Sequence, residues 1–389
     1  MRFWNRDSVP VLPPPGRDLR LDLFRGIANW QIFLNHIPSN AVNWITTEYY
    51  GFSDAADLFV FISGYTAAFV YMRIMLGRGT LPASMRIFGR ACQIYITQVI
   101  LFCAYAAGIG YLAMRYHDPN LDDVYNIRLF FEHPSQLLGA ALTLRYKPLN
   151  MDILPVYILL MLGCPAMLWG LVLAPDVVMV GSVLLYFIAR HFDLNLPSYP
   201  YGVWYFNPFC WQLYFVAGAW FATGGRTRSL PVIESRVLVP LAVTYLIFAL
   251  VMTLAGRFPE LRVVFPNWLY DTFNPNDKTN LAPYRVVHLA FIILVTTRFF
   301  PRDLPGLTRR IFRPVILCGQ QSLAVFSTGI FLSFAAYFVL IQVTDAIWMQ
   351  VLVSVAGIAL LSILAWFKTW VRRIDRPAAR ITRGSSPGA

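Results

Sequence analysis

A stripe of polar residues runs along the first long apolar segment of the sequence, residues 19–38. At about 100° per residue, Asp22, Arg25, Asn29 and His36 would share one narrow face of a helix. His36 would then lie about 16 Å farther along the axis than Arg25. Ionisable groups at membrane depth usually line functional cavities, and histidine can act as a base near neutral pH. The stripe therefore predicts His36 as a general base, with Arg25, Asp22 and Asn29 binding substrate.

A structural role would explain part of the same stripe. Polar residues inside a bundle join neighbouring helices, and an Asp22–Arg25 pair could simply anchor the helix end. For these two residues alone we favour that role. The presence of His36 on the same face shifts the interpretation toward function.

Two carboxylates stand at the start of the second apolar segment, in GFSDAADLFVFISGY. Asp54 and Asp57 are i,i+3 neighbours, and one of them could hold the His36 imidazole in a single tautomer as a further catalytic group. The alternative is a helix N-cap at Asp54, with Asp57 favoured by the helix dipole. Both interpretations stay open for Asp57. The adjacent Ser63–Gly64 pair indicates close helix packing rather than a nucleophile.

Two later segments add candidate binding residues. RYKPLNMDILPVY places Asp152 at the start of the fourth apolar segment, where it either lines the site or only begins a helix. NDKTNLAPYRVVHLA places Lys278 before the eighth segment, with Arg285 and His288 inside it. Lys278 and Arg285 are predicted to bind an acyl carboxylate or a CoA phosphate, since a guanidinium matches both anions. A lone buried histidine is usually structural, but Arg285 beside His288 favours a site.

The composition indicates which elements must position these residues. Of the 389 residues, 57% are hydrophobic and 13% are charged, against about 25% charged in soluble domains. Apolar runs of about 20 residues, enough to cross a ~30 Å hydrocarbon layer, recur throughout the chain. We predict an all-α polytopic bundle of about ten transmembrane helices. Their expected positions are 19–38, 54–77, 87–114, 151–173, 176–191, 208–224, 237–256, 282–300, 315–341 and 345–368. Segment 134–145 is too short to cross and is expected to be re-entrant or interfacial.

The basic residues predict the topology of the bundle. With both termini in the cytoplasm, most of the 32 Lys and Arg residues fall in short cytoplasmic segments. Arg86 and Arg90 belong to this set, and we attribute them to topology rather than to nucleotide binding. The expected organisation is a cytoplasmic segment 1–18, a membrane domain 19–370 and a basic cytoplasmic tail 371–389.

Several partners are excluded or left open by the sequence. The net charge of +12 does not indicate nucleic acid, because the basic residues lie in short loops rather than on one exposed face. The five cysteines show no metal-ligand spacing, so no metal site is expected. The lipid bilayer is the expected surrounding, and a homo-oligomer is compatible with the sequence.

The motifs resemble those of a known group of enzymes. DLFRG with Arg25-x10-His36, followed by SDAADLFVFISGY, is similar to the membrane-bound acyltransferase-3 superfamily, and more narrowly to the OpgC family. That family is linked to succinylation of osmoregulated periplasmic glucans. The matching pieces also include NHIPSNAVNW, LRYKPLNMDILPVYILLML, NDKTNLAPYRVVHLA and GQQSLAVFSTGIFLS. In contrast to some acyltransferase-3 members, no hydrolase-like domain is expected after residue 370.

The resemblance implies a reaction and a location. It implies a multi-pass protein of the bacterial inner membrane that transfers an acyl group from succinyl-CoA, or another acyl-CoA, to a hydroxyl of a periplasmic glucan or other glycan. The acyl-CoA is a donor substrate, and no permanently bound cofactor is expected. Direct transfer and a transient acyl-enzyme both stay open. A transporter or flippase of an acyl or glycan intermediate is the alternative, and a structural subunit of a glycan synthase is a third.

Overall fold

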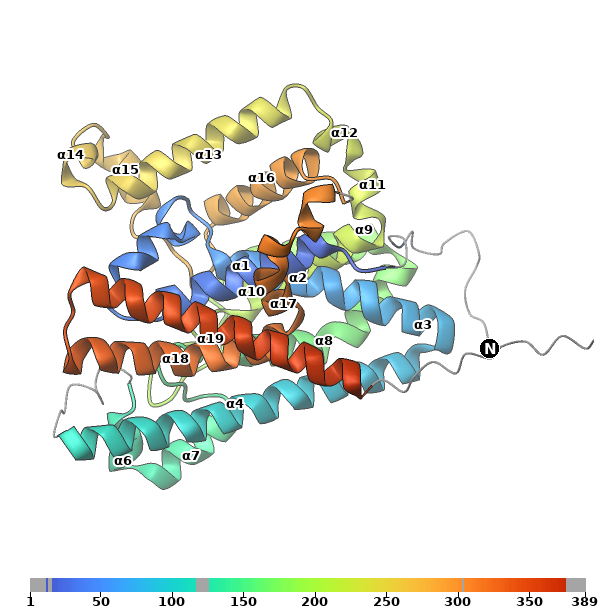
Figure 1. Cartoon of the computed structure of the whole chain (residues 1–389). Helices are drawn as coiled ribbons and strands as arrows, with labels where there is room; N and C mark the ends of the chain where they lie inside the picture. Colours follow the sequence, from blue (N-terminus) through green and yellow to red (C-terminus); the bar gives the residue numbers. More distant parts are fainter. Residues whose placement is uncertain (1–11, 13–15, 117–125, 303, 376–389) are drawn as a thin grey trace, which may run out of the picture.

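The computed structural model describes residue 12 and residues 16–116, 126–302 and 304–375, and within these ranges it is a bundle of helices (Figure 1). Most of the predicted N-terminal segment and of the basic tail lies outside the described residues. The long helices are α1 (Leu19–Asn35), α2 (Ala55–Ala67), α4 (Thr80–Tyr116), α8 (Ile153–Leu173), α9 (Pro175–His191), α10 (Pro208–Trp220), α13 (Leu238–Ala255), α16 (Pro283–Phe299), α18 (Ser322–Gln342) and α19 (Ile347–Ile374). The predicted all-α class is confirmed.

Short elements connect and extend these helices. The short α-helices are α3 (Arg73–Arg78), α6 (Arg128–Glu132), α7 (Pro134–Leu142), α11 (Arg226–Arg228), α12 (Leu230–Ile233), α14 (Pro259–Arg262), α15 (Asn267–Phe273) and α17 (Arg313–Gln320). Two π-helical segments, η4 (Ala68–Met72) and η5 (Phe221–Gly225), continue α2 and α10, and 3-10 turns occupy η2 (Ala41–Ile45), η3 (Thr47–Tyr49), η6 (Pro305–Thr308) and η7 (Arg310–Phe312). In the described chain, extended pairing is confined to an isolated bridge between Pro197 and Val203.

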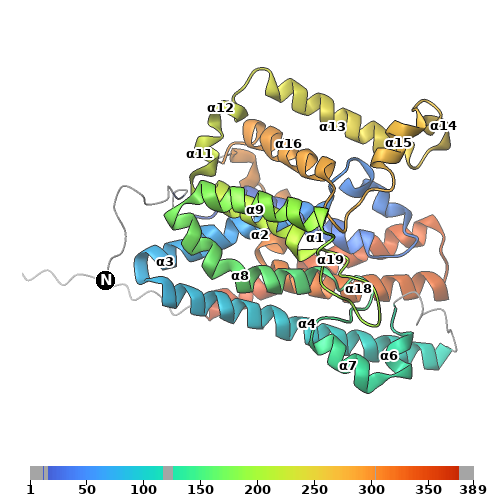
Figure 2. The same cartoon turned by 180° about the vertical axis from the view of Figure 1, so that it is seen from behind.

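The connections gather at two ends of the bundle (Figures 1 and 2). We call one the basic end, where α1 begins, α3 turns into α4 and α19 finishes. We call the other the loop end, where α1 finishes and α2 and α16 begin. The segments predicted to be cytoplasmic lie toward the basic end, and the longer predicted outer loops lie at the loop end. Which end faces the cytoplasm stays a prediction.

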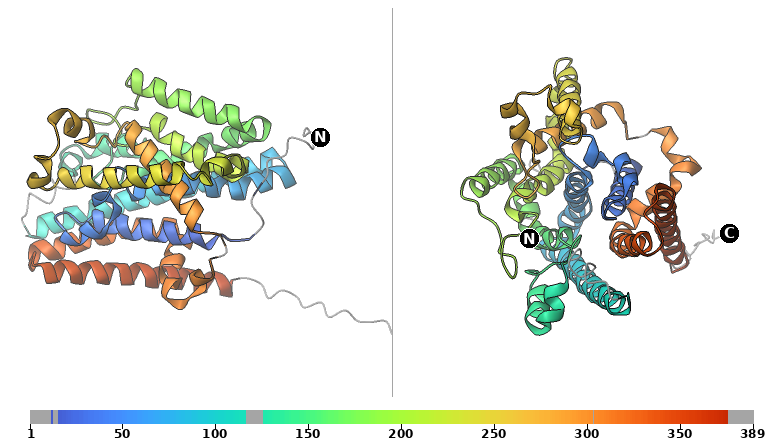
Figure 3. Two further views of the ribbon diagram at one scale, coloured as in Figure 1. Left: turned by 90° about the horizontal axis from the view of Figure 1, so that it is seen from above. Right: turned by 90° about the vertical axis from the view of Figure 1, so that its left-hand side faces the viewer.

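The long helices run side by side, as the views from above and from the loop end show (Figure 3). Among the described residues, six helical stretches are long and apolar enough to cross a membrane: 55–78, 80–116, 153–173, 238–255, 322–342 and 347–374. The chain is therefore a multi-pass membrane protein. Four other expected spans coincide with the shorter helices α1, α9, α10 and α16, which have 13 to 17 residues. The count of about ten spans stays a prediction.

Facing glycines bring the central helices together. Gly26 of α1 packs against the Val315 carbonyl of α17, and Gly319 of α17 packs against the Asp22 carbonyl. Gly64 of α2 packs in the same way against Phe215 of α10. A Cβ atom at any of these glycines would clash with backbone, so only glycine permits this approach. The predicted packing role of Gly64 is confirmed.

The structure changes two expected boundaries. The first segment ends at Asn35, so His36 is the C-cap of α1 rather than a residue inside the helix. The expected span 315–341 is broken at Gln321, whose φ of −106° and ψ of 28° separate α17 from α18. Segment 134–145 contains the nine-residue helix α7, which is too short to cross.

Candidate functional site

A buried cluster of charges lies at the loop end, where α2 and α16 begin. Arg285 donates to Asp57 at 2.6 Å and to Asp54 at 3.4 Å, and Lys278 Nζ lies 2.6 Å from Asp54. Asp54 is also the N-cap of α2, and Asp57 accepts from its backbone N–H in a capping box. The predicted capping role is confirmed, whereas the carboxylates pair with Lys278 and Arg285 and not with the His36 imidazole that either of them was predicted to orient. We name these four residues the charge cluster.

His288 belongs to the same region but has a different partner. Its Nδ1 lies 2.6 Å from the Ser53 hydroxyl and accepts from the Ser53 backbone N–H at 3.2 Å. Its ring also packs against Gly51, where a Cβ would overlap the imidazole. His288 therefore holds the chain that leads into α2.

His36 lies near the charge cluster without bonding to it. Lys278 and Asp54 are close enough to act electrostatically on the imidazole, but no hydrogen bond joins His36 to a carboxylate in the described structure. Its Nδ1 is buried and has no hydrogen-bond partner among the described residues. Asn150 donates to the His36 carbonyl at 3.2 Å. This contact brings the loop before α8 against the C-cap of α1.

A polar cavity of about 330 Å³ opens beside the charge cluster. Lys278 and Asp54 lie in its wall, together with Arg257, Asn274 and Asn276. The Arg257 guanidinium stacks 3.6 Å from the centre of the Tyr49 ring. The cavity thus combines charged groups, amides and aromatic rings, which are the groups that bind sugar hydroxyls and sugar faces.

Two lysines from other segments lie against aromatic rings of the loop between α9 and α10. The Lys147 ammonium lies 4.1 Å from the centre of the Trp204 ring, and the Lys278 ammonium lies 5.5 Å from that of Phe206. Burial lowers the pKa of Lys147 to about 8, although the nearby Asp152 carboxylate opposes that shift. Burial alone would also lower the pKa of Lys278, but the Asp54 carboxylate raises it. The ion pair with Asp54 thus favours the charged form of Lys278, whereas burial disfavours the charged form of Lys147.

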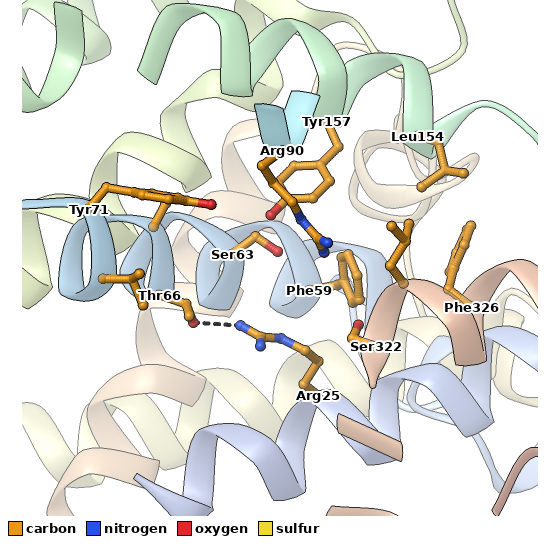
Figure 4. Close-up of a pocket in the computed structure, with 13 residues that line it drawn as sticks. Arg25, Phe59, Ser63, Thr66, Tyr71, Arg90, Leu154, Tyr157, Ser322 and Phe326 are labelled. Carbon is orange, nitrogen blue, oxygen red and sulfur yellow. Dashed lines mark hydrogen bonds between the residues drawn. The ribbon is translucent and has the colours of Figure 1, made fainter. Parts of the chain in front are cut away.

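Toward the basic end, three cavities meet at Arg25. Its guanidinium donates to the Thr66 hydroxyl and, at 3.2 Å, to the Ile62 carbonyl, and it has no carboxylate partner in the part of the chain that the structure describes. We name one of the three the central cavity; it has a volume of about 130 Å³ and is drawn in Figure 4. Arg90 of α4 enters it from the wall opposite Arg25, beside Tyr157. The predicted Asp22–Arg25 pair does not form directly, because Asp22 pairs with Arg17 and accepts from Gln320. Gly26 and Gly319 bring α17 close enough for this arrangement.

The cavity between α4 and α19 is strongly basic. It has a volume of about 420 Å³, and its charged lining residues are Arg25, Arg90, Lys368 and Arg372, with no carboxylate among the described lining residues. Ser322 lies between this cavity and the central one, and accepts from Asn29 at 3.3 Å. Four positive charges around one cavity suit a ligand with several phosphates.

The structure thus divides the predicted site residues between two regions. Asp54, Asp57, Lys278, Arg285 and His288 come together at the loop end, with His36 beside them. Arg25, Asn29 and Asp22 lie toward the basic end, around the other cavities. Asp152 begins α8 and contributes through its charge on Lys147.

Sequence reasoning missed Arg90, Lys368, Arg372 and Asn150 as site residues. The sequence attributes Arg90 to topology, yet Arg90 lines two of the cavities that hold Arg25. The pattern along the first segment could not identify these residues, because they come from other segments of the chain. Among the described residues, no group of three or more His, Cys, Asp and Glu side chains could hold a metal ion.

A family model described as OpgC protein matches residues 17–373. The chain belongs to the OpgC family. The match covers α1 and almost all of α19, and therefore includes both the charge cluster and the Arg25 cavities. No curated protein and no solved structure matches the chain. Membership of the OpgC family implies a transferase and suggests a glucan-modifying acyltransferase. The wider acyltransferase-3 placement stays a prediction.

Proposed function

We propose that this OpgC-family protein is a membrane O-acyltransferase that takes a succinyl group from succinyl-CoA in the cytoplasm and transfers it to a hydroxyl of a periplasmic glucan. The observation that carries the proposal is the separation of two unlike sites along α1. Basic cavities meet at Arg25, and a polar, aromatic cavity lies at the loop end beside the charge cluster. In this proposal the basic end faces the cytoplasm of a bacterial inner membrane.

The donor would bind at the basic end. Arg25, Arg90, Lys368 and Arg372 supply positive charge without neighbouring carboxylates in the α4–α19 cavity, which supports binding of the CoA phosphates there. The central cavity holds Arg25 and Ser322, and Ser322 accepts from Asn29 of α1; in this proposal the acyl end of the donor travels from there along α1 to His36. Phe59 and Phe326, whose ring centres are 6.1 Å apart, lie in its wall. The acyl end of the donor has to pass these rings to reach the loop end.

The acceptor would bind at the loop end. Its hydroxyl would be placed against His36, which removes the proton as the oxygen attacks the thioester carbonyl. The C–S bond then breaks, and the CoA thiolate leaves with the proton from the imidazolium. Lys278, held charged by Asp54, can stabilise the succinyl carboxylate or the developing oxyanion.

Asp54 and Asp57 take a revised role in this mechanism. Arg285 is only 3% exposed and is shared between both carboxylates, so it is poorly placed to bind a substrate carboxylate directly. We assign Asp54, Asp57 and Arg285 as positioning residues that fix Lys278 and the start of α2. His288 supports the same segment through Ser53.

A transfer assay with the purified protein tests the proposal. Labelled succinyl-CoA and glucan should give labelled glucan with the native protein in detergent. His36→Ala should lower the rate by about 10²–10⁴-fold, the range for loss of a general base. His133→Ala, at an exposed histidine of the same end, should leave the rate unchanged.

The same assay separates catalysis from transport. A transporter or flippase would move its cargo across a membrane but would form no ester in detergent. Full transfer by His36→Ala would exclude His36 as the base, and absence of transfer by the native, folded protein would contradict the enzyme proposal itself.

A further inference from the structure

An apolar groove separates α16 from the two central helices. At the loop end, Arg285 and His288 tie α16 to the start of α2 through Asp57 and Ser53. At the basic end, Arg20 of α1 donates to the Phe300 carbonyl just after α16. Between these ties α16 packs mainly against α13 and α12, and a cavity of about 300 Å³ lies between it and α1–α2.

Apolar side chains line the groove over most of its length. Its apolar walls come from three helices, with Leu21, Phe24 and Ile27 on α1, Leu58 and Phe61 on α2, and Ile293 on α16. Along α1 it extends from Leu21 to Gln31, which corresponds to about 15 Å. That length equals about half of the ~30 Å hydrocarbon core, the depth that one leaflet occupies.

Positive charge gathers where the groove reaches the basic end. Asp18, Arg20 and Arg226 line this part, and Arg302 lies close by. Asp18 is the carboxylate partner of both Arg20 and Arg302. Arg226 is exposed and has no carboxylate partner among the described residues. The mouth of the groove therefore carries an excess of positive charge beside an apolar channel.

We propose that the groove binds one anionic phospholipid of the bilayer, with an acyl chain between α16 and α1–α2 and its phosphate at Arg226. An acyl chain supplies the apolar contacts that an unfilled cavity lacks. The phosphate compensates the excess positive charge at the mouth. By filling the space behind α16, the lipid supports the helix that presents Arg285 to the charge cluster. The inference does not depend on the proposed acyl transfer.

Lipid retention by the purified full-length protein tests this site. The protein is reconstituted with equal amounts of phosphatidylglycerol and phosphatidylethanolamine, extracted in mild detergent, and its retained lipids are counted by native mass spectrometry. We expect about one phosphatidylglycerol per chain. Ile293→Trp and Ile27→Trp, which fill the groove, should each lose it. Ile247→Trp, at a position exposed on α13, should retain it.

A second kind of variant changes the charge at the mouth of the groove and leaves the packing inside the groove unchanged. Arg226→Gln should lower the preference for phosphatidylglycerol about fivefold, the effect of one basic residue near the membrane surface. Arg228→Gln, which removes the neighbouring arginine that pairs with Asp176, should not. Equal retention in the groove-filling and control variants, equal preference in the two arginine variants, or displacement of the lipid by acyl-CoA would each overturn the proposal.

Discussion

The two ends of the bundle handle charge in opposite ways. At the loop end, Asp54 and Asp57 neutralise Lys278 and Arg285 within a buried cluster. Toward the basic end, Arg25 and Arg90 line cavities and have no carboxylate partner in the described chain. A neutralised buried cluster is costly to disrupt, whereas uncompensated cations are available to an incoming anion. We infer that the loop end is preorganised, and that the proposed donor would complete the basic end.

The largest effect should come from breaking the neutrality of the loop end. Asp57→Ala leaves Arg285 buried without its closest partner, which should destabilise the fold by about 3–5 kcal/mol. Thermal unfolding in detergent measures this loss. Asp176→Ala, which removes the partner of exposed Arg228, should shift the unfolding midpoint little, because exposed pairs contribute about 0–1 kcal/mol. Equal shifts in the two variants would show that the charge cluster is not a stabilising unit.

Variants at the basic end should affect donor binding rather than folding. Arg25→Gln should raise the KM for acyl-CoA about 10- to 100-fold, as expected for loss of a charge-assisted hydrogen bond. Arg372→Gln, at the more exposed edge of the α4–α19 cavity, should raise it only a few-fold, and more at low salt. Arg373→Gln, one position along α19 and outside that lining, is the control. An unchanged KM in Arg25→Gln would contradict the assignment of the donor site.

The smallest effect concerns the pH dependence of stability at Lys147. Its pKa of about 8 lies below the usual lysine value, so burial of the charge costs stability below that pH. The native protein should gain stability as the pH rises from about 8 to about 10.4, the ordinary lysine pKa. Lys147→Met should therefore be relatively more stable at pH 7 than at pH 10. A pH-independent difference in unfolding midpoint would contradict the lowered pKa.

The sequence predicted local patterns well and contacts between segments poorly. The polar stripe of α1 and the paired aspartates of α2 could be identified because their spacing lies within one helix. Arg90, in contrast, lines the same cavities as Arg25 only because α4 packs against α8, α3 and α18. The break at Gln321 also depends on tertiary contacts, since Gln321 donates to Thr369 of α19. Hydropathy treats such a stretch as one continuous apolar run.

The partners of Asp54 and Asp57 were also outside the reach of local spacing. Either carboxylate could have oriented His36 on the basis of position alone. Lys278 and Arg285 reach them from a segment more than 200 residues later, and their charges make ion pairing more favourable than a hydrogen bond to a neutral imidazole. Which of several polar groups meet in a bundle is decided by helix packing, which a single sequence specifies only indirectly.

Transfer measured with each substrate confined to one side of a membrane tests most directly whether donor and acceptor bind at opposite ends of the protein. The native protein is reconstituted into vesicles in one orientation, determined with an epitope at the C-terminus. Succinyl-CoA, which does not cross the bilayer, is supplied on one side and glucan on the other. We expect labelled glucan only when succinyl-CoA is on the side of the epitope and glucan is on the opposite side. Equal transfer with both substrates on the side away from the epitope would contradict it.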